Sequence, residues 1–375
     1  MRKKIIFNNP SIIGDETKNI GKVINQKHFS SNGYFTKKCS SWLIKNIKCK
    51  EALLVHSCTA ALEMCAILLN IKSGDEIIMP SYTFVSTANA FVLRGGKPIF
   101  VDINSRTLNI DENLIEKAIT KKTKAIVVVH YAGVACNMEK ISTIAKKNNL
   151  ILIEDSAQGL LSKYKGKYLG SFGDLATVSF HETKNIHCGE GGALLINNNK
   201  FIKRAKIIRD KGTNRDQFNK NLVKKYTWVD IGSSYALSEI NCAFLYSQLK
   251  KSKKTIQKRL AIWKLYFSLF SELKHKLQLP HISSEVSHNA HIFFIILKKN
   301  NRQKFLKSLN KKKINAIFHY IPLHSSPAFI NKNKKIKNLV NTNYIADNLI
   351  RLPLHNKIKK SDIIRIKHAV IECLK

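Results

Sequence analysis

The 375-residue sequence contains no run of about 18 apolar residues, the minimum length with which an α-helix crosses a bilayer. Its first stretch, Met1–Pro10, is basic, but it has neither the apolar segment nor the small-residue cleavage site of a signal peptide. From these two absences we expect a cytoplasmic protein without membrane insertion.

Arrangements typical of metal sites and disulfide frameworks are also missing. The eight cysteines are scattered along the chain, and no two of them form a CxxC pair. His319 and His324 stand five residues apart with Pro322 between them, which does not match the i, i+4 spacing of a helical zinc site. We expect reduced, mostly buried thiols and no bound metal.

Acidic residues are scarce: 25 Asp and Glu face 64 Lys and Arg, a formal net charge of +39. Such a charge alone suggests a partner that carries phosphates, such as nucleic acid. The lysines, however, are spread along the whole chain, and we find no recognisable nucleic-acid-reading motif. We interpret the charge as a compositional bias toward Lys, Asn and Ile. We expect no nucleic-acid partner, but the charge should attract phosphorylated substrates.

Short apolar runs alternate with longer amphipathic segments in the first part of the chain. Hydrophobic residues make up 44% of the sequence, enough for a packed core and two domains. Near-continuous apolar strands separated by helices, such as Ala60–Leu69 and Met138–Lys147, predict one large α/β domain whose mixed, mostly parallel seven-stranded sheet is covered on both faces. The seven expected strands are Ala52–Val55, Glu76–Met79, Pro98–Val101, Ala125–His130, Leu150–Glu154, Thr177–Phe180 and Ala193–Ile196.

The pattern changes after Ile240, so we predict a large domain over 1–240, with an N-terminal arm over 1–25, and a small α+β domain over 241–375. The small domain should contain a long helix, either continuous or broken, followed by two strands, a solvated loop and a final helix. These segments are Asn241–Leu273, His291–Leu297, Ala316–Tyr320, Asn331–Lys337 and Ser361–Leu374.

Lys184 is the lysine with the most informative surroundings. It follows a strand-like run, Ala176–Phe180, and precedes the glycine-rich Gly189–Gly192; the previous strand ends in Asp155. A pyridoxal phosphate enzyme needs such an arrangement, because the lysine binds the cofactor covalently and the acid keeps the pyridine nitrogen protonated. Lys184 must be neutral to react, so burial and nearby positive charge should lower its pKa. A surface lysine in a loop is the ordinary alternative.

Three further features favour the cofactor hypothesis together, although each has an ordinary alternative. At Val55–Met64 a strand ends and hydroxyl residues cap a helix near Thr59, which is a natural phosphate site or merely an N-cap. The hydroxyl of Ser179 could bind phosphate as well. At Pro80–Asn89 an aromatic can lie on a cofactor ring or fill the core. The buried Asp155 needs a partner, which a pyridinium would supply.

These segments resemble the cofactor motifs of the DegT/DnrJ-type nucleotide-sugar aminotransferases, which are fold-type I pyridoxal phosphate enzymes with an aspartate aminotransferase-like fold. The resemblance extends over nearly the whole chain, from Phe7–Pro10 to Arg351–Leu354. By position it implies that Lys184 is the covalent lysine and proton shuttle, that Asp155 pairs with the pyridinium nitrogen and that Gln158 contacts the phenolic oxygen of the ring.

The resemblance also implies the remaining site residues. Phe84 occupies the ring-stacking position, and Thr59, Ala60 and Ser179 hold the phosphate. Ser234 stands where many relatives carry an asparagine that reaches the phosphate from the neighbouring subunit, so a homodimer is expected. His187 and His324 are expected near the substrate.

The reaction implied is transfer of an amino group from L-glutamate to carbon 4 of dTDP-4-keto-6-deoxyglucose, giving dTDP-4-amino-4,6-dideoxygalactose for a cell-surface polysaccharide. The motifs that narrow the resemblance in this way are His130–Cys136, His181–Asn185, Lys211–Arg215 and Tyr226–Tyr235. Two alternatives stay open: transamination of another nucleotide sugar or an aminocyclitol, and a non-catalytic regulator with the same fold.

Overall fold

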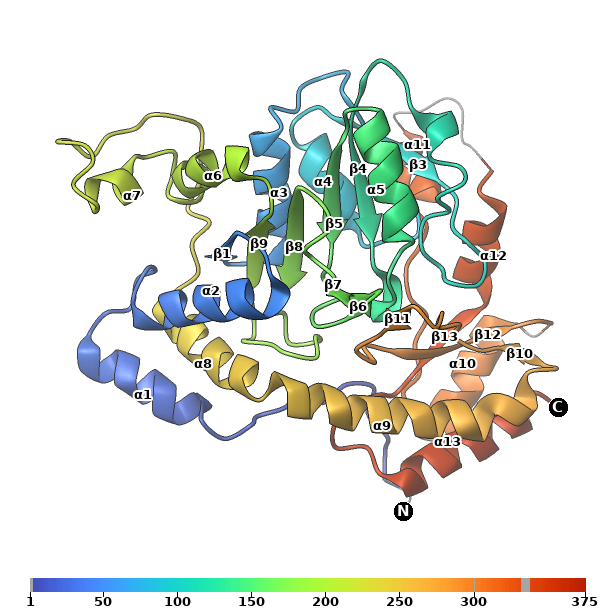
Figure 1. The fold of residues 1–375 in the computed structure, drawn as a ribbon. Coiled ribbons are helices and arrows are strands. Elements are labelled where there is room, and N and C mark those ends of the chain that lie inside the picture. The colour runs from blue at the N-terminus through green and yellow to red at the C-terminus, as the bar shows by residue number, and fades with distance from the viewer. Residues whose placement is uncertain (1–2, 300, 332–337) are drawn as a thin grey trace.

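A seven-stranded sheet forms the centre of the computed structural model, which describes residues 3–299, 301–331 and 338–375. The strand order is β1-β9-β8-β5-β4-β2-β3 (Figure 1). Four neighbouring pairs are parallel, and β9 is antiparallel to both its neighbours. The sheet confirms all seven predicted strands: β1 (Glu51–Val55), β2 (Glu76–Pro80), β3 (Lys97–Val101), β4 (Thr123–Val129), β5 (Ile151–Asp155), β8 (Leu175–Ser179) and β9 (Gly192–Ile196).

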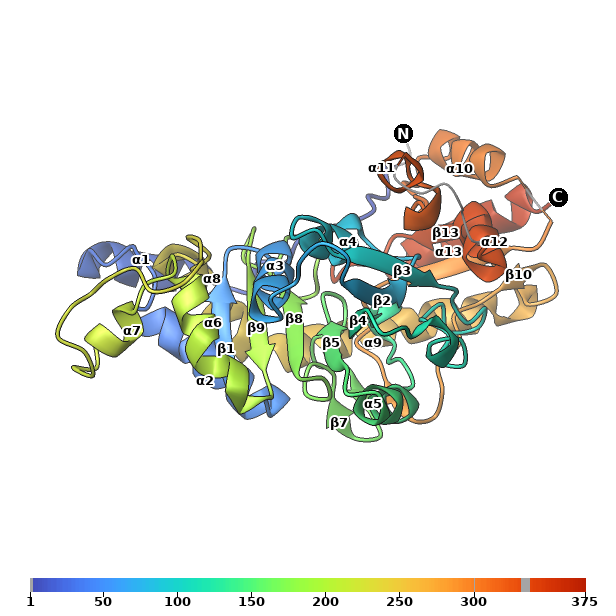
Figure 2. The ribbon, with the colours of Figure 1, turned by 90° about the horizontal axis from the view of Figure 1, so that it is seen from above.

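Helices cover both faces of this sheet because its strands are apolar on both sides (Figure 2). Ile77 and Met79 of β2 pack in one cluster with α3 and α4, whereas Ile78 packs in another with α5 on the opposite face. The expected helices at Ala60–Leu69 and Met138–Lys147 are confirmed. The helices of this part are α1 (Glu16–Gln26), α2 (Tyr34–Ile47), α3 (Cys58–Leu68), α4 (Val85–Val92), α5 (Met138–Lys147), α6 (Ile202–Arg209) and α7 (Arg215–Phe218).

A second core lies in the C-terminal part, around a three-stranded sheet of order β10-β12-β13. The predicted long helix is confirmed as two helices that break at Lys251, and the final helix is confirmed as α13. The elements are α8 (Glu239–Lys250), α9 (Ser252–Phe270), β10 (Leu277–Gln278), β12 (Phe293–Leu297), α10 (Arg302–Lys311), α11 (Pro327–Ile330), α12 (Val340–Asn348), β13 (Leu349–Leu352) and α13 (Lys360–Cys373).

A small third sheet joins residues that are distant in sequence, because β11 (Val286–Ser287) pairs with β6 (Lys163–Tyr164), which pairs in turn with β7 (Lys167–Tyr168). The N-terminal arm also spans both parts of the chain: α1 packs on α8, and Ile5 pairs with Ile314. The domain boundary at residue 240 stays a prediction.

The predicted strand Ala316–Tyr320 is wrong, since only Ile317 pairs there, in an isolated bridge with Arg351. The rings of His319 and Tyr320 stack with centroids 3.8 Å apart. Successive side chains of a strand point to opposite faces, so this stacking excludes regular strand geometry. Most of the predicted loop Asn331–Lys337 lies outside the described residues.

Six of the eight cysteines are buried, as predicted. Over the described ranges, no helix is both long enough and apolar enough to cross a membrane.

Candidate active site

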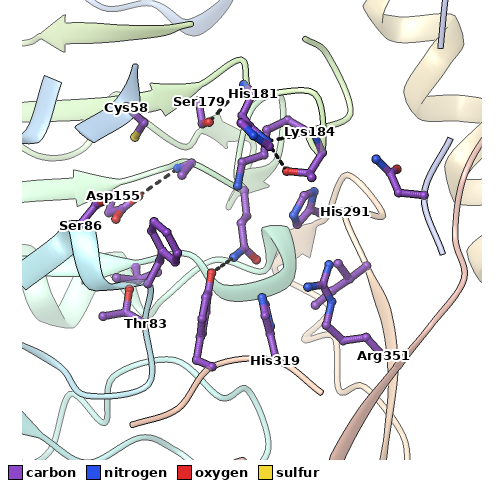
Figure 3. A pocket seen from close by; sticks show the side chains of 18 of the residues that line it. Cys58, Thr83, Ser86, Asp155, Ser179, His181, Lys184, His291, His319 and Arg351 are labelled. Carbon is purple, nitrogen blue, oxygen red and sulfur yellow. Dashed lines mark hydrogen bonds between the residues drawn. The ribbon is translucent and has the colours of Figure 1, made fainter. Parts of the chain in front are cut away.

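A cavity of about 680 Å³ opens beside the C-terminal ends of β5 and β8 (Figure 3). Asp155 ends β5, Ser179 ends β8, and Lys184 lies on the loop that follows. Because parallel strands end at the same edge of a sheet, these residues meet although 29 positions separate Asp155 from Lys184. The C-terminal part of the chain closes the other side of the cavity.

Lys184 is held by a turn in which its N–H donates to the carbonyl of His181 at 2.9 Å. The next residue, Asn185, donates through its side chain to the carbonyl of Asn289 at 2.8 Å, which anchors the loop to the C-terminal part. Burial lowers the pKa of Lys184 below the ordinary lysine value, and the positive charge of Arg351 lowers it further. The direction of this pKa change is the one expected for a lysine that must lose its proton to react.

Asp155 is 5% exposed and accepts two hydrogen bonds, from Thr87 Oγ1 at 2.7 Å and from the N–H of Ala157 at 3.1 Å. Burial raises its pKa, and these two donors and the charge of Lys184 offset the increase only in part. A buried carboxylate is stable when a cation pairs with it. A protonated pyridine nitrogen fits this requirement.

Gln158 and Phe84 line the same cavity. Gln158 is fixed at both ends of its amide: Oε1 accepts from the N–H of Ala132 at 2.7 Å, and Nε2 donates to the hydroxyl of Tyr320 at 2.6 Å. Phe84 precedes α4 and is 57% exposed, an unusual exposure for a large aromatic. An apolar ring open to a cavity is suited to cover a planar ligand.

The first turn of α3 forms an anion-binding end of the cavity. Ser57 caps the helix by accepting from the N–H of Ala60 at 3.0 Å, whereas the N–H groups of Cys58 and Thr59 have no acceptor within the helix. The hydroxyl of Thr59 lies 2.8 Å from that of Ser86, and Ser179 lines the cavity beside them. Backbone N–H groups and hydroxyls at a helix N-terminus suit a phosphate.

Gly192 permits the close approach of β9 to the first turn of α3. A Cβ atom at Gly192 would lie 2.4 Å from the carbonyl carbon of Ser57 and 2.5 Å from the nitrogen of Cys58. Only glycine therefore allows β9 to pass so close to the first turn of α3.

Four predicted residues do not line the cavity. Ala60 is buried and gives its N–H to the cap. Ser234 is exposed and pairs with Asp210 on a segment outside this chain's own cavity. The ring of His187 is held by the carbonyl of Ser11 at 3.0 Å, and that of His324 by the hydroxyl of Ser81 at 2.7 Å. Both histidines are buried and do not line the cavity, so their contact with the substrate stays a prediction.

The C-terminal part contributes residues that the sequence reading missed. They are Arg259, His291, His319, Tyr320 and Arg351. The only local signal was Arg351, a charge inside the apolar run Leu349–Leu354. In the part of the chain that the structure describes, no group of three or more His, Cys, Asp or Glu side chains is arranged to hold a metal ion.

The profile of the DegT/DnrJ/EryC1/StrS aminotransferase family matches residues 10–371. The chain is 38% identical over 331 residues to an uncharacterized protein of Methanocaldococcus jannaschii, covering 86% of this chain and 85% of the relative. It is 31% identical over 369 residues to the GDP-perosamine synthase of Escherichia coli O157:H7, covering 97% and 96%.

Among solved structures, the chain is similar to Spr1654 of Streptococcus pneumoniae, a protein assigned as a sugar aminotransferase. The PLP form of that protein superposes with a TM-score of 0.91 at 25% identity and covers 99% of both chains. Its PMP form superposes with a TM-score of 0.92.

Proposed function

Because the chain belongs to the DegT/DnrJ/EryC1/StrS aminotransferase family, we propose that it transfers the amino group of L-glutamate to carbon 4 of dTDP-4-keto-6-deoxyglucose. The products are 2-oxoglutarate and dTDP-4-amino-4,6-dideoxygalactose, so one amine and one keto oxygen exchange places and no other reactant is consumed. The observation that carries the proposal is the meeting of Lys184, Asp155 and the first turn of α3 in one cavity.

Pyridoxal 5'-phosphate is the cofactor. When bound, it supplies a ring that accepts electrons from the reacting carbon. Asp155 would face its ring nitrogen, Gln158 its phenolic oxygen and Phe84 its plane, while Thr59 and Ser179 would hold its phosphate.

Lys184 would do the proton chemistry. Burial lowers the pKa of its amine, and this amine would hold the cofactor until a substrate amine takes its place. The freed amine takes a proton from the α-carbon of glutamate and later gives one to carbon 4 of the sugar, so the same nitrogen acts as general base and general acid. Since both substrates use one site in turn, the kinetics should be ping-pong.

A GDP-linked 4-keto-6-deoxy sugar is the second candidate acceptor. It is favoured by the 31% identity over nearly the full length to a protein named for GDP-perosamine. Both acceptors react at a keto carbon 4, so the roles of Lys184 and Asp155 are the same for either acceptor.

The first test is spectroscopic. We expect the purified protein with pyridoxal phosphate to show an absorbance band of covalently bound cofactor that shifts on addition of L-glutamate. Lys184→Ala should lack the band, and borohydride reduction of the wild type should leave a pyridoxyl group on Lys184 by mass spectrometry. A wild-type protein without the band would refute the enzyme hypothesis.

Product analysis then separates the two acceptors. The dTDP and GDP 4-keto-6-deoxy sugars are incubated separately with the enzyme and L-glutamate, and the amino sugar is identified by NMR. We expect an axial amine at carbon 4 from the dTDP sugar. Turnover of the GDP sugar alone would replace the first proposal with the second.

A further inference from the structure

Two buried threonine hydroxyls connect the cavity wall to Asp155. Thr87 Oγ1 donates to Asp155 Oδ2 at 2.7 Å, and Thr83 Oγ1 lies 2.8 Å from Thr87 Oγ1. Thr83 and Asp155 both line the cavity (Figure 3), and Thr87 is buried. The threonines come from the segment that follows β2, whereas Asp155 ends β5, and β4 lies between these two strands in the sheet. The hydrogen bond to Asp155 therefore spans the ends of three strands.

The direction of the two hydrogen bonds follows from the number of protons that the groups carry. A carboxylate can only accept, so Thr87 uses its single hydroxyl proton on Asp155. In the contact between the two hydroxyls, Thr83 must then donate and Thr87 must accept. Both hydroxyl protons are thus directed toward the acid. Hydrogen bonds of this kind stabilise the ionised form of a carboxyl group.

Thr87 fixes the oxygen of Asp155 that the local chain leaves free. Oδ1 of Asp155 accepts from the N–H of Ala157, two residues along the chain, at 3.1 Å. Oδ2 accepts from Thr87, which lies 68 positions away in the sequence. Each oxygen of a carboxylate has two lone pairs, so both oxygens keep the capacity to accept one more hydrogen bond. Asp155 is therefore held at both oxygens and can still accept from a cationic N–H in the cavity.

The charge of Asp155 depends on the Thr87 hydroxyl. Burial raises the pKa of Asp155, and the hydrogen bond from Thr87 is the largest of the effects that lower it. Loss of this hydroxyl should shift Asp155 toward its neutral form. The other titratable groups whose charges interact with Asp155 are Lys184, His130, Cys58, Cys65 and Tyr320. All of them are unchanged in a threonine variant.

We propose that Thr87 is a positioning residue that keeps Asp155 ionised and oriented for the ring nitrogen of the cofactor, and that Thr83 directs the Thr87 hydroxyl toward the acid. The inference rests on the proposed role of Asp155 and names the residues that support it. Packing alone does not require these hydroxyls, since valine has nearly the shape of threonine without the polar atom.

The first experiment measures Asp155 in the full-length protein without cofactor, so its result does not depend on transamination. Aspartate labelled with ¹³C at the side-chain carboxyl is incorporated, and NMR follows the pH titration of the signal that Asp155→Asn lacks. Thr87→Val should titrate at higher pH than the wild type, because a donor to the ionised form is lost. Thr87→Ser keeps the hydroxyl and should titrate near the wild type. Thr83→Val should change in the same direction as Thr87→Val, but less.

The second experiment measures the Kd for pyridoxal phosphate by absorbance. Thr87→Val should raise the Kd about tenfold or more, because a hydrogen bond to a charged group is lost. The ratio of the variant's Kd to that of the wild type should grow as the pH falls, since Asp155 of the variant is protonated at higher pH. Thr87→Ser should restore most of the affinity. Thr255→Val makes the same change at a buried position outside the cavity and is the matched control.

The two experiments separate this inference from the proposed function. An Asp155 titration in Thr87→Val equal to that of the wild type would overturn the inference. Equal loss of affinity in Thr87→Ser and Thr87→Val would also overturn it, because the missing methyl group and hence packing would then be the cause. If Thr87→Val does not fold by circular dichroism, an unchanged titration in Thr83→Val overturns the directed pair. A wild type that does not bind pyridoxal phosphate would refute the proposed reaction, not the effect of Thr87 on Asp155.

Discussion

Lys184 shows how strongly the reactivity of a residue depends on its surroundings. The chain is rich in lysines, but this one is placed in a cavity where burial and Arg351 both disfavour its charged form. Cys58 and Asp155 act in the opposite direction and do not cancel the effect. The lower pKa gives Lys184 a larger neutral fraction than an exposed lysine has at the same pH.

The pH dependence of cofactor capture should report this shift. Only the neutral amine reacts with pyridoxal phosphate, so the capture rate of the apoprotein should rise with pH and level off below the ordinary lysine pKa of 10.5. Arg351→Gln removes a positive neighbour, which raises the pKa of Lys184 and should move the rise to higher pH. Stopped-flow absorbance measures both curves; a wild-type curve that levels off only near 10.5 would contradict the burial argument.

Much of the predicted site lies together because strand ends meet in a parallel sheet. Lys184, Asp155, Gln158 and Thr59 follow strands β8, β5 and β1, and a reader of the sequence can place them at one edge. Arg351 could not be placed in the same way. It lies within the C-terminal strand β13, where no motif marks it, and only the packing of the C-terminal part against the sheet brings it to the cavity.

At the scale of the element, the few acids of this chain fix backbone turns and helix ends. Asp102, which follows β3, accepts from the N–H groups of Asn341 and Thr342 at 3.0 and 2.8 Å and so caps α12. Glu239 of α8 accepts from the N–H groups of Phe35 and Thr36, each at 2.8 Å, and so caps α2. In both cases a carboxylate satisfies a helix N-terminus that its own residues leave open.

Glu154 is the most deeply buried example, and its loss should destabilise the fold. It accepts from the N–H groups of Gly170, Phe172 and Gly173 at 2.7–2.8 Å and from His130 Nε2 at 3.0 Å. Glu154→Gln places an amide N–H₂ against these donors and should cost about 3 kcal/mol of unfolding free energy. Urea titration measures the loss, and the exposed Glu116→Gln is the control.

The pH dependence of that loss follows from the pKa of Glu154. Burial would raise the pKa, but the hydrogen bonds from His130 and the backbone outweigh it, and the net pKa lies below the ordinary value of 4.5. A carboxylate with a lowered pKa in the fold stabilises above its unfolded pKa and ceases to do so as the pH falls through the folded value. The difference between wild type and Glu154→Gln should therefore be full at neutral pH and shrink below pH 4.5. A constant difference would contradict this account.

The elements themselves were predictable where apolar runs are long enough to be buried on both faces. All seven strands of the large sheet meet this condition. The segment Ala316–Tyr320 has a similar composition, yet its aromatic side chains turn together toward the cavity instead of alternating. Composition does not reveal this difference in side-chain direction, because the neighbouring elements impose the direction.

At the scale of the whole molecule, large apolar side chains are exposed on the segment that carries α7, which projects from the body (Figure 1). Trp228 is 77% exposed and Leu222 is 70% exposed, and Val229 and Ile231 are about half exposed. The predicted partner residue, Ser234, ends the same segment. We therefore propose that this segment packs on a second copy of the chain and brings Ser234 toward the phosphate end of the partner's cavity.

The net charge of +39 per chain opposes that association, so the homodimer should strengthen with salt. Two like-charged protomers repel over a Debye length of about 30 Å at 0.01 M salt and about 10 Å at 0.1 M, whereas apolar contacts depend little on screening. We expect sedimentation to show a dimer whose dissociation constant is lower at 0.1 M salt than at 0.01 M salt. Trp228→Lys should raise the dissociation constant at both, whereas Lys220→Ala, which removes a charge from the same segment, should lower it slightly. A wild-type monomer that keeps full activity at both salt concentrations would show that the exposed apolar segment does not serve the active site.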